Sequence, residues 1–115
     1  MRIILDTNIL LAALIKDSLT RKIIIKSGWK FFYPLVALGE IKKYETLILE
    51  KSGLTPSQYH ELLEKITSYI NFVQQNILDP FMDEANSIIV NIDKNDVVFT
   101  ATALAVENDG IWSDD

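Results

Sequence analysis

The chain has 115 residues, of which 49% are hydrophobic, and a formal net charge of −5 at pH 7. This length and apolar content predict a single domain over residues 1–115 with its own buried core. Because the sequence contains no cysteine, it has no disulfides, zinc–thiolate sites or iron–sulfur clusters. No apolar run is long enough to cross a membrane and no signal peptide is recognisable, so we expect a soluble, cytoplasmic protein without membrane contact.

The charges are unevenly distributed along the chain. Residues 1–51 hold nine Lys and Arg side chains against five acidic ones, whereas residues 52–115 hold two against eleven. The acidic total argues against strong nonspecific binding of nucleic acid by the whole surface. A basic half beside an acidic half agrees with a polyanion-facing surface next to a cation-binding one, and equally with ordinary solvated faces.

Short apolar runs alternate with helical patterns from the N-terminus onward. The patterns predict strands over residues 2–5, 30–33, 71–74 and 111–113. They predict helices over residues 8–16, 18–27, 35–51, 56–70, 80–92 and 95–108. The clearest helix start is Thr55 as the N-cap followed by Pro56 at the first helical position.

Strands that are separated by helices, without hairpin signals between them, are typical of a parallel sheet that is covered on both faces. The predicted fold class is therefore α/β, a three-layer α/β/α sandwich with a mainly parallel central sheet. Ligands of such sheets bind outside the carboxyl ends of the strands, where strand order reverses. The residues that follow the predicted strands are therefore the first candidates for a site.

Acidic residues follow two of the predicted strands. Asp6 ends the first strand in the run ILDTNIL, and Asp114 and Asp115 follow the last strand in the run GIWSDD. Taken alone, Asp6, Thr7 or Asn8 would be explained as the N-cap of the next helix. Two strands that deliver acids to one sheet edge are more than capping requires.

Glu40 lies on a predicted helix and interrupts an otherwise apolar face. Its neighbours on that face are Val36, Ala37, Tyr44 and Leu47. Because acids are rarely buried without a partner, two interpretations stay open. Glu40 is either a functional acid or a residue at the rim of the apolar face that reaches water.

The run DKNDVVFTATALAV places Asp93 and Asp96 three positions apart. Helix capping explains Asp93 well, and the helix macrodipole favours Asp96 in the first turn. Asp96 shares its helical face with Phe99, Thr100 and Ala103, which are mostly apolar or small. A purely surface role therefore fits Asp96 less well than Asp93.

Several carboxylates that gather in one pocket need a cation. Two of them about 5 Å apart repel by about 3 kcal/mol at an effective dielectric constant of about 20. Oxygen ligands favour Mg²⁺ or Mn²⁺, which keep exchangeable waters for the phosphate oxygens of a substrate. Such a site activates water for the hydrolysis of a phosphodiester, as two-metal nucleases do.

The runs ILDTNIL, ALGEIKKY, DKNDVVFTATALA and IWSDD resemble, in order and spacing, the PIN-domain ribonucleases, especially the VapC-like toxins of prokaryotic toxin–antitoxin pairs. The resemblance covers nearly the whole chain. It implies an endoribonuclease that depends on Mg²⁺ or Mn²⁺ and hydrolyses RNA. It also implies a homodimer and a cognate antitoxin that holds the toxin inactive.

The resemblance implies roles for particular residues, which fall into acidic, polar and basic groups. The catalytic residues and metal ligands are expected to be Asp6, Glu40, Asp96 and Asp115, with Asp93 and Asp114 as further metal candidates, Thr7, Asn8 and Ser113 as supporting polar residues, and Lys42 and Lys43 as residues that bind RNA phosphates. The last family motif, Thr or Ser, any residue, then Asp, favours Asp115 over Asp114. Family members usually continue past this acid, so a truncated C-terminus is one alternative to a complete domain.

Two other functions stay open at this stage. A catalytically idle PIN-like scaffold that binds only a partner protein would carry the same sequence pattern. A receiver-type phosphoacceptor domain also collects acids around Mg²⁺, but it requires an Asp at the end of a middle strand, which neither FFYP nor NFVQ supplies. The single histidine, His60, has no partner ligands on its predicted helix and indicates neither a zinc site nor a catalytic triad.

Overall fold

The computed structural model describes residues 1–88 and 94–113. Within these ranges four strands form one sheet, namely β1 (Arg2–Leu5), β2 (Lys30–Pro34), β3 (Ile70–Val73) and β4 (Gly110–Trp112). Their order is β3-β2-β1-β4, and each neighbouring pair is parallel. The predicted strands are confirmed with shifts of one residue at most.

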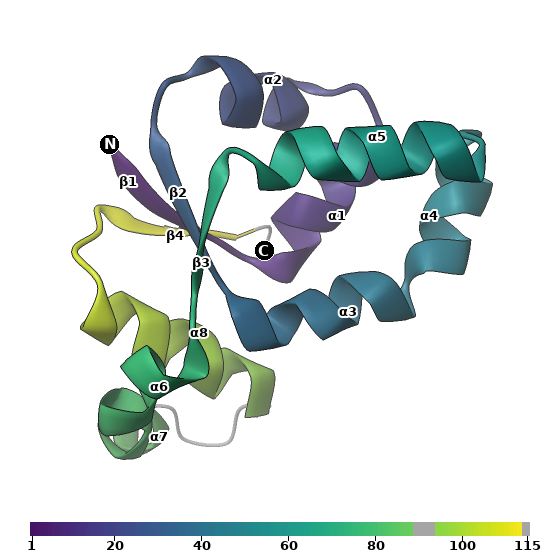
Figure 1. Cartoon of the computed structure of the whole chain (residues 1–115). Helices are drawn as coiled ribbons and strands as arrows, with labels where there is room; N and C mark the ends of the chain where they lie inside the picture. The colour runs from purple at the N-terminus through teal and green to yellow at the C-terminus, as the bar shows by residue number, and fades with distance from the viewer. Residues whose placement is uncertain (89–93, 114–115) are drawn as a thin grey trace.

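Helices cover both faces of this sheet. They are α1 (Thr7–Ile15), α2 (Leu19–Lys26), α3 (Leu38–Lys43), α4 (Glu45–Ser52), α5 (Pro56–Thr67), α6 (Gln75–Leu78), α7 (Met82–Ile88) and α8 (Lys94–Ala105), with short 3₁₀ turns η1 (Leu35–Ala37) and η2 (Asp79–Phe81). Figure 1 shows α1 to α5 on one side of the sheet and α6 to α8 on the other. The predicted three-layer α/β/α sandwich is confirmed. None of the helices in the described ranges is long and apolar enough to cross a bilayer.

The single helix predicted over residues 35–51 is wrong. The chain instead forms η1, α3 and α4, and it bends at Tyr44, whose φ of −96° and ψ of 9° lie in the sparsely allowed bridge region. The N–H of Tyr44 donates to the carbonyls of Glu40 and Ile41 at 3.2 Å each, which closes α3. The side chains of α3 and α4 therefore do not share one continuous face.

The helix predicted over residues 80–92 also differs from the structure. The described part of this region begins earlier, with α6 at Gln75, and continues through η2 into α7, which runs to Ile88. Pro80 lies inside η2, where a missing N–H costs no helical hydrogen bond. Residues 89–92 of the prediction lie outside the described residues.

The start of α5 agrees with the prediction. Thr55 accepts a hydrogen bond of 3.2 Å from the N–H of Gln58, and the Gln58 side chain accepts one of 3.0 Å from the N–H of Thr55. This reciprocal pair is a capping box. The helix ends at Thr67, earlier than predicted, because Ile70 is already the first residue of β3.

The last described helix, α8, ends at Ala105 and not at the predicted residue 108. The side-chain amide of Asn108 explains the earlier end. Its Nδ2 donates to the carbonyls of Ala103 and Val106 at 2.9 Å each, and so satisfies carbonyl groups that a continuing helix would have bonded.

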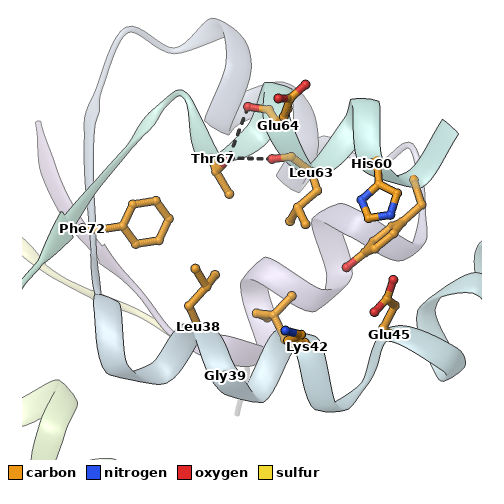
Figure 2. A pocket seen from close by; sticks show the side chains of 11 residues that line it. Leu38, Gly39, Lys42, Glu45, His60, Leu63, Glu64, Thr67 and Phe72 are labelled. Carbon is orange, nitrogen blue, oxygen red and sulfur yellow. Dashed lines mark hydrogen bonds between the residues drawn. The ribbon is translucent and has the colours of Figure 1, made fainter. Parts of the chain in front are cut away.

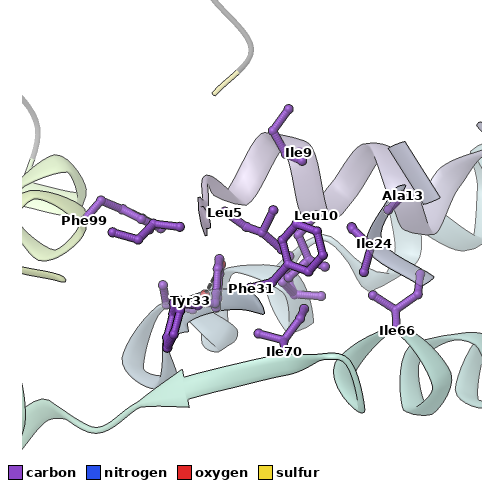
Figure 3. Packing of buried hydrophobic residues seen from close by; sticks show 14 of the residues in the cluster. Leu5, Ile9, Leu10, Ala13, Ile24, Phe31, Tyr33, Ile66, Ile70 and Phe99 are labelled. Atoms are coloured by element: carbon purple, nitrogen blue, oxygen red, sulfur yellow. Dashed lines mark hydrogen bonds between the residues drawn. The ribbon is translucent and has the colours of Figure 1, made fainter. Parts of the chain in front are cut away.

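The core lies on both sides of β2. Its residues Phe31, Phe32, Tyr33 and Pro34 are all buried, as expected for a central strand with helices on both faces. Figure 3 shows Phe31 and Tyr33 among buried residues of α1, α2, α5, β3 and α8. Residues of α1, α3 and α8, the helices that carry or directly follow candidate acids, thus belong to the same core as β2.

Candidate functional site

The strand order of the sheet reverses at β1. The chain moves from β1 to β2 and β3 on one side, and then returns to pair β4 with the other side of β1. At the carboxyl end of this pair, Leu5 lies opposite Trp112, and the N–H of Asp6 donates to the Trp112 carbonyl at 3.0 Å. Asp6 and Ser113 therefore follow two adjacent strands at the crevice where ligands of such sheets bind.

Asp6 is the N-cap of α1. Its backbone is extended, and its side chain accepts a hydrogen bond of 3.4 Å from the N–H of Asn8. The capping interpretation of Asp6 is thus confirmed. Because 3.4 Å is long for an N–H···O hydrogen bond, the cap constrains this half-buried carboxylate only weakly. Capping and ligand binding by Asp6 are therefore compatible.

Thr7 is buried beneath this edge, whereas Asn8 is exposed. The Thr7 hydroxyl lies 2.8 Å from the hydroxyl of Tyr33, and Tyr33 in turn donates a hydrogen bond of 3.0 Å to the carbonyl of Ala37. Thr7 thus belongs to a buried chain of hydrogen bonds that runs from α1 through β2 to η1. Its hydroxyl thus connects the residue that follows Asp6 to the buried interior.

Tyr33 did not emerge from the sequence as a site residue. Burial raises its pKa to about 12, the hydrogen bond from Thr7 opposes this shift, and the carboxylates of Glu40 and Asp6 each add to it. Both acids are therefore close enough to the Tyr33 hydroxyl to disfavour negative charge there. A signal existed in the sequence, because a tyrosine near the end of a buried apolar strand needs a partner for its hydroxyl.

Glu40 is half-buried on α3, but the face on which it was placed is not a core face. Val36, Tyr44 and Leu47 are 57%, 41% and 40% exposed, respectively. The idea that Glu40 interrupts a buried apolar stripe is wrong, because that stripe assumed one straight helix through Tyr44. The buried side chain of α3 is Ile41 instead. Glu40 itself is half-buried, at the rim of the core, which agrees with either interpretation of this residue.

A pocket of about 310 Å³ lies beside Glu40, between η1, α3 and α8. It is lined by Val36, Ala37, Gly39, Glu40, Lys43, Val98 and Phe99. The pocket thus combines an apolar wall with one acid and one base.

Asp96 lies in the first turn of α8 and is exposed. It does not line the pocket beside Glu40, but Phe99, one turn further along α8, does. The ring of Phe99 also contacts Tyr33 edge-on, with centroids 5.7 Å apart. The other predicted acids, Asp93, Asp114 and Asp115, lie outside the described residues, as the grey trace in Figure 1 indicates.

The two lysines predicted to meet RNA lie on different faces of α3. Lys43 lines the pocket beside Glu40, whereas Lys42 lines a larger pocket of about 690 Å³ between α3 and α5. Figure 2 shows Leu38, Leu63 and Phe72 around this larger pocket, with His60 and Glu45 toward one end. The larger pocket is mostly apolar and contains none of the candidate acids.

The donor atoms at the sheet edge fit a hard divalent cation. Among residues 1–88 and 94–113, no three His, Asp or Glu side chains gather as a group that would hold a metal ion. Mg²⁺, however, usually keeps several waters and is held by only one or two carboxylates together with substrate phosphates. Asp6, which follows β1 at this edge, and Glu40 on α3 are the candidates for such carboxylates among the described residues.

The order of the strands and the helical layers define an α/β/α domain. Its candidate hydrolytic site lies at the carboxyl ends of the strands, where Asp6 follows β1. The family model for the PIN domain matches residues 4–115, so the chain belongs to the PIN domain family. Members of this family are generally nucleases that bind nucleic acid and typically use divalent metals. Comparisons with curated proteins and with solved structures find no significant match.

Proposed function

We propose that this protein is an endoribonuclease that depends on Mg²⁺ or Mn²⁺, hydrolyses RNA phosphodiester bonds, and acts as the toxin of a toxin–antitoxin pair. The observation that supports the activity most is the position of Asp6, which directly follows β1 where the strand order reverses and whose N–H donates to the Trp112 carbonyl at the carboxyl end of β4. Ligands of such sheets bind at this edge, so a carboxylate there is well placed to bind a cation.

In this proposal the cation is bound by the carboxylates of Asp6, Glu40, Asp96 and Asp115. Asp93 or Asp114 is a further ligand. When bound, the cation stabilises charge on the phosphate and lowers the pKa of a water. Lys43, which shares the pocket with Glu40, binds a phosphate of the RNA strand. Asn8 and Ser113, both exposed at the same edge, donate or accept hydrogen bonds around the substrate.

The partners follow from the resemblance of the four sequence runs to VapC-like toxins. A homodimer and a cognate antitoxin protein are part of the proposal on that ground. A cytoplasmic location agrees with the absence of cysteine from the sequence. The receiver-type alternative loses support because the family model that matches residues 4–115 is that of the PIN domain.

The proposal is tested by incubating the protein with a mixed pool of single-stranded RNA in Mn²⁺ and by mapping the cut ends. We expect cleavage by the wild type, none in EDTA, and a loss of at least about 100-fold for Asp6→Asn. Asp17→Asn is the matched control, because Asp17 is exposed in the loop after α1. If the wild type leaves all RNA intact in Mn²⁺ and in Mg²⁺, the idle protein-binding scaffold becomes the better hypothesis.

A further inference from the structure

The Tyr33 hydroxyl connects two of the segments that carry candidate acids. Its partner on α1, Thr7, directly follows Asp6 in the chain, and the oxygens of the two hydroxyls are 2.8 Å apart. Its partner in η1 is the carbonyl of Ala37 at 3.0 Å, three residues before Glu40. Three residues are less than one helical turn. Asp6 and Glu40 therefore each lie within one turn of a residue that is hydrogen-bonded to the Tyr33 hydroxyl.

The ring of Tyr33 reaches the third segment. It contacts Phe99 on α8 with a centroid distance of 5.7 Å and an interplanar angle of 67°, and Phe99 lies three residues after Asp96. On its other side the ring meets Phe72 of β3 at 6.3 Å and 89°. Edge-on contacts of this kind restrict how the ring rotates. Tyr33 therefore touches α1, η1 and α8 from one position at the end of β2.

The direction of the two hydrogen bonds can be assigned. A tyrosine hydroxyl has one proton, and Tyr33 gives it to the carbonyl of Ala37. The Thr7 hydroxyl must then donate its own proton to the oxygen of Tyr33. The hydrogen bonds therefore run in one direction, from Thr7 to Tyr33 and from Tyr33 to Ala37. They require a hydroxyl group at position 7 and at position 33. Serine would preserve it at position 7, whereas valine, with the same shape as threonine, would break it.

We infer that Tyr33 is a positioning residue of the acidic site, whose hydroxyl ties the start of α1 to η1 and so sets the spacing of Asp6 and Glu40 for one divalent cation. This inference rests on the proposed function. Packing alone does not explain the hydroxyl, since phenylalanine would fill the same space and make the same ring contacts with Phe72 and Phe99.

The physical role of the tie is clearest without metal. Two carboxylates that are spaced to share one cation repel each other when it is absent, and this repulsion favours arrangements in which α1 and α3 lie further apart. The buried hydrogen bonds oppose this separation because breaking them leaves polar groups without partners away from water. A cation then binds to a site that is already assembled. Without these hydrogen bonds the binding-competent arrangement is less populated, so the apparent affinity for the cation is lower.

The test is a calorimetric titration of the folded protein with Mn²⁺ alone, in the absence of RNA. Residues that support metal ligands from behind typically change metal affinity by 10- to 100-fold when removed. We expect Tyr33→Phe and Thr7→Val each to raise the dissociation constant for Mn²⁺ about tenfold. Thr7→Ser should restore an affinity close to that of the wild type, which a merely structural loss at position 7 would not do.

Tyr59→Phe is the matched control, because Tyr59 is as buried as Tyr33 but lines the pocket between α3 and α5. It should bind Mn²⁺ like the wild type. If Tyr33→Phe does not fold, the comparison of Thr7→Val with Thr7→Ser decides the question. Unchanged affinity in Tyr33→Phe and Thr7→Val, or an equal loss in Tyr59→Phe, would overturn the inference while leaving the proposed function intact. A wild type that does not bind Mn²⁺ would overturn both.

Discussion

The hydroxyls of Thr7 and Tyr33 lie 2.8 Å apart in the buried interior, although 26 positions separate them in the chain. This contact joins the end of β1 to the end of β2, which are neighbouring parallel strands. Both strands lead directly into segments that carry a candidate acid, Asp6 and Glu40. A buried polar contact thus lies beside both of these segments.

The two roles of Asp6 can be separated by substitution. Asparagine and aspartate are about equally good N-caps, whereas alanine loses about 1 kcal/mol. Both variants remove the charge of Asp6 but only asparagine keeps the cap, so in EDTA we expect the free energy of unfolding of Asp6→Ala to lie about 1 kcal/mol below that of Asp6→Asn. Urea denaturation followed by circular dichroism measures both values. Stabilisation by Mn²⁺ should disappear in both variants, and its survival in Asp6→Asn would remove Asp6 from the metal site.

The raised pKa of Tyr33 predicts a loss of stability in alkali. Its pKa is about 12 in the folded protein against 10.0 for an ordinary tyrosine, so the unfolded chain releases this proton first as the pH rises. The stabilising contribution is complete below pH 10 and is lost between about pH 10 and pH 12, up to about 3 kcal/mol. Tyr33→Phe should lack this part of the decline. Parallel unfolding free energies of wild type and Tyr33→Phe across this range would contradict the prediction.

The two neighbouring lysines of α3 provide an internal comparison. Lys43 lines the pocket beside Glu40 and Lys42 lines the other pocket, so only Lys43→Ala should weaken RNA binding. Each lost phosphate contact lowers the slope of log affinity against log salt concentration by about 0.7 for a single strand. Fluorescence anisotropy with labelled RNA, in the Asp6→Asn background to prevent cleavage, measures this slope. Equal losses for Lys42→Ala and Lys43→Ala would show that neither pocket is selective.

The capping box of α5 should contribute to stability and not to activity. Thr55→Ala removes the acceptor for the N–H of Gln58 and should lower the free energy of unfolding by about 1 kcal/mol. Ser57→Ala, an exposed neighbour in the first turn, should change it by less than about 0.5 kcal/mol. Cleavage of RNA at a temperature well below unfolding should be unaffected in both variants. A loss of cleavage in Thr55→Ala would connect α5 to the active site.

The position of Asp6 at the sheet edge could be predicted from the sequence because its signals are local. Asp6 lies directly after an apolar strand, and parallel strands bring their carboxyl ends to one edge of a sheet. Glu40 was predicted as a functional acid from an apolar face that is largely exposed in the structure, so that argument for it fails. Tyr33 was not found, because the sequence does not show which groups a buried hydroxyl will meet.

The sequence by itself determined the alternation of strands and helices, the α/β class and the N-cap at Thr55, because these follow from patterns of residues that are close together in the chain. The tertiary structure alone decided that the chain bends at Tyr44, that Lys42 and Lys43 face different pockets, and that Thr7 meets Tyr33. These features depend on which elements pack together. That choice is made by the burial of the whole core around β2, to which residues far apart in the chain contribute at once.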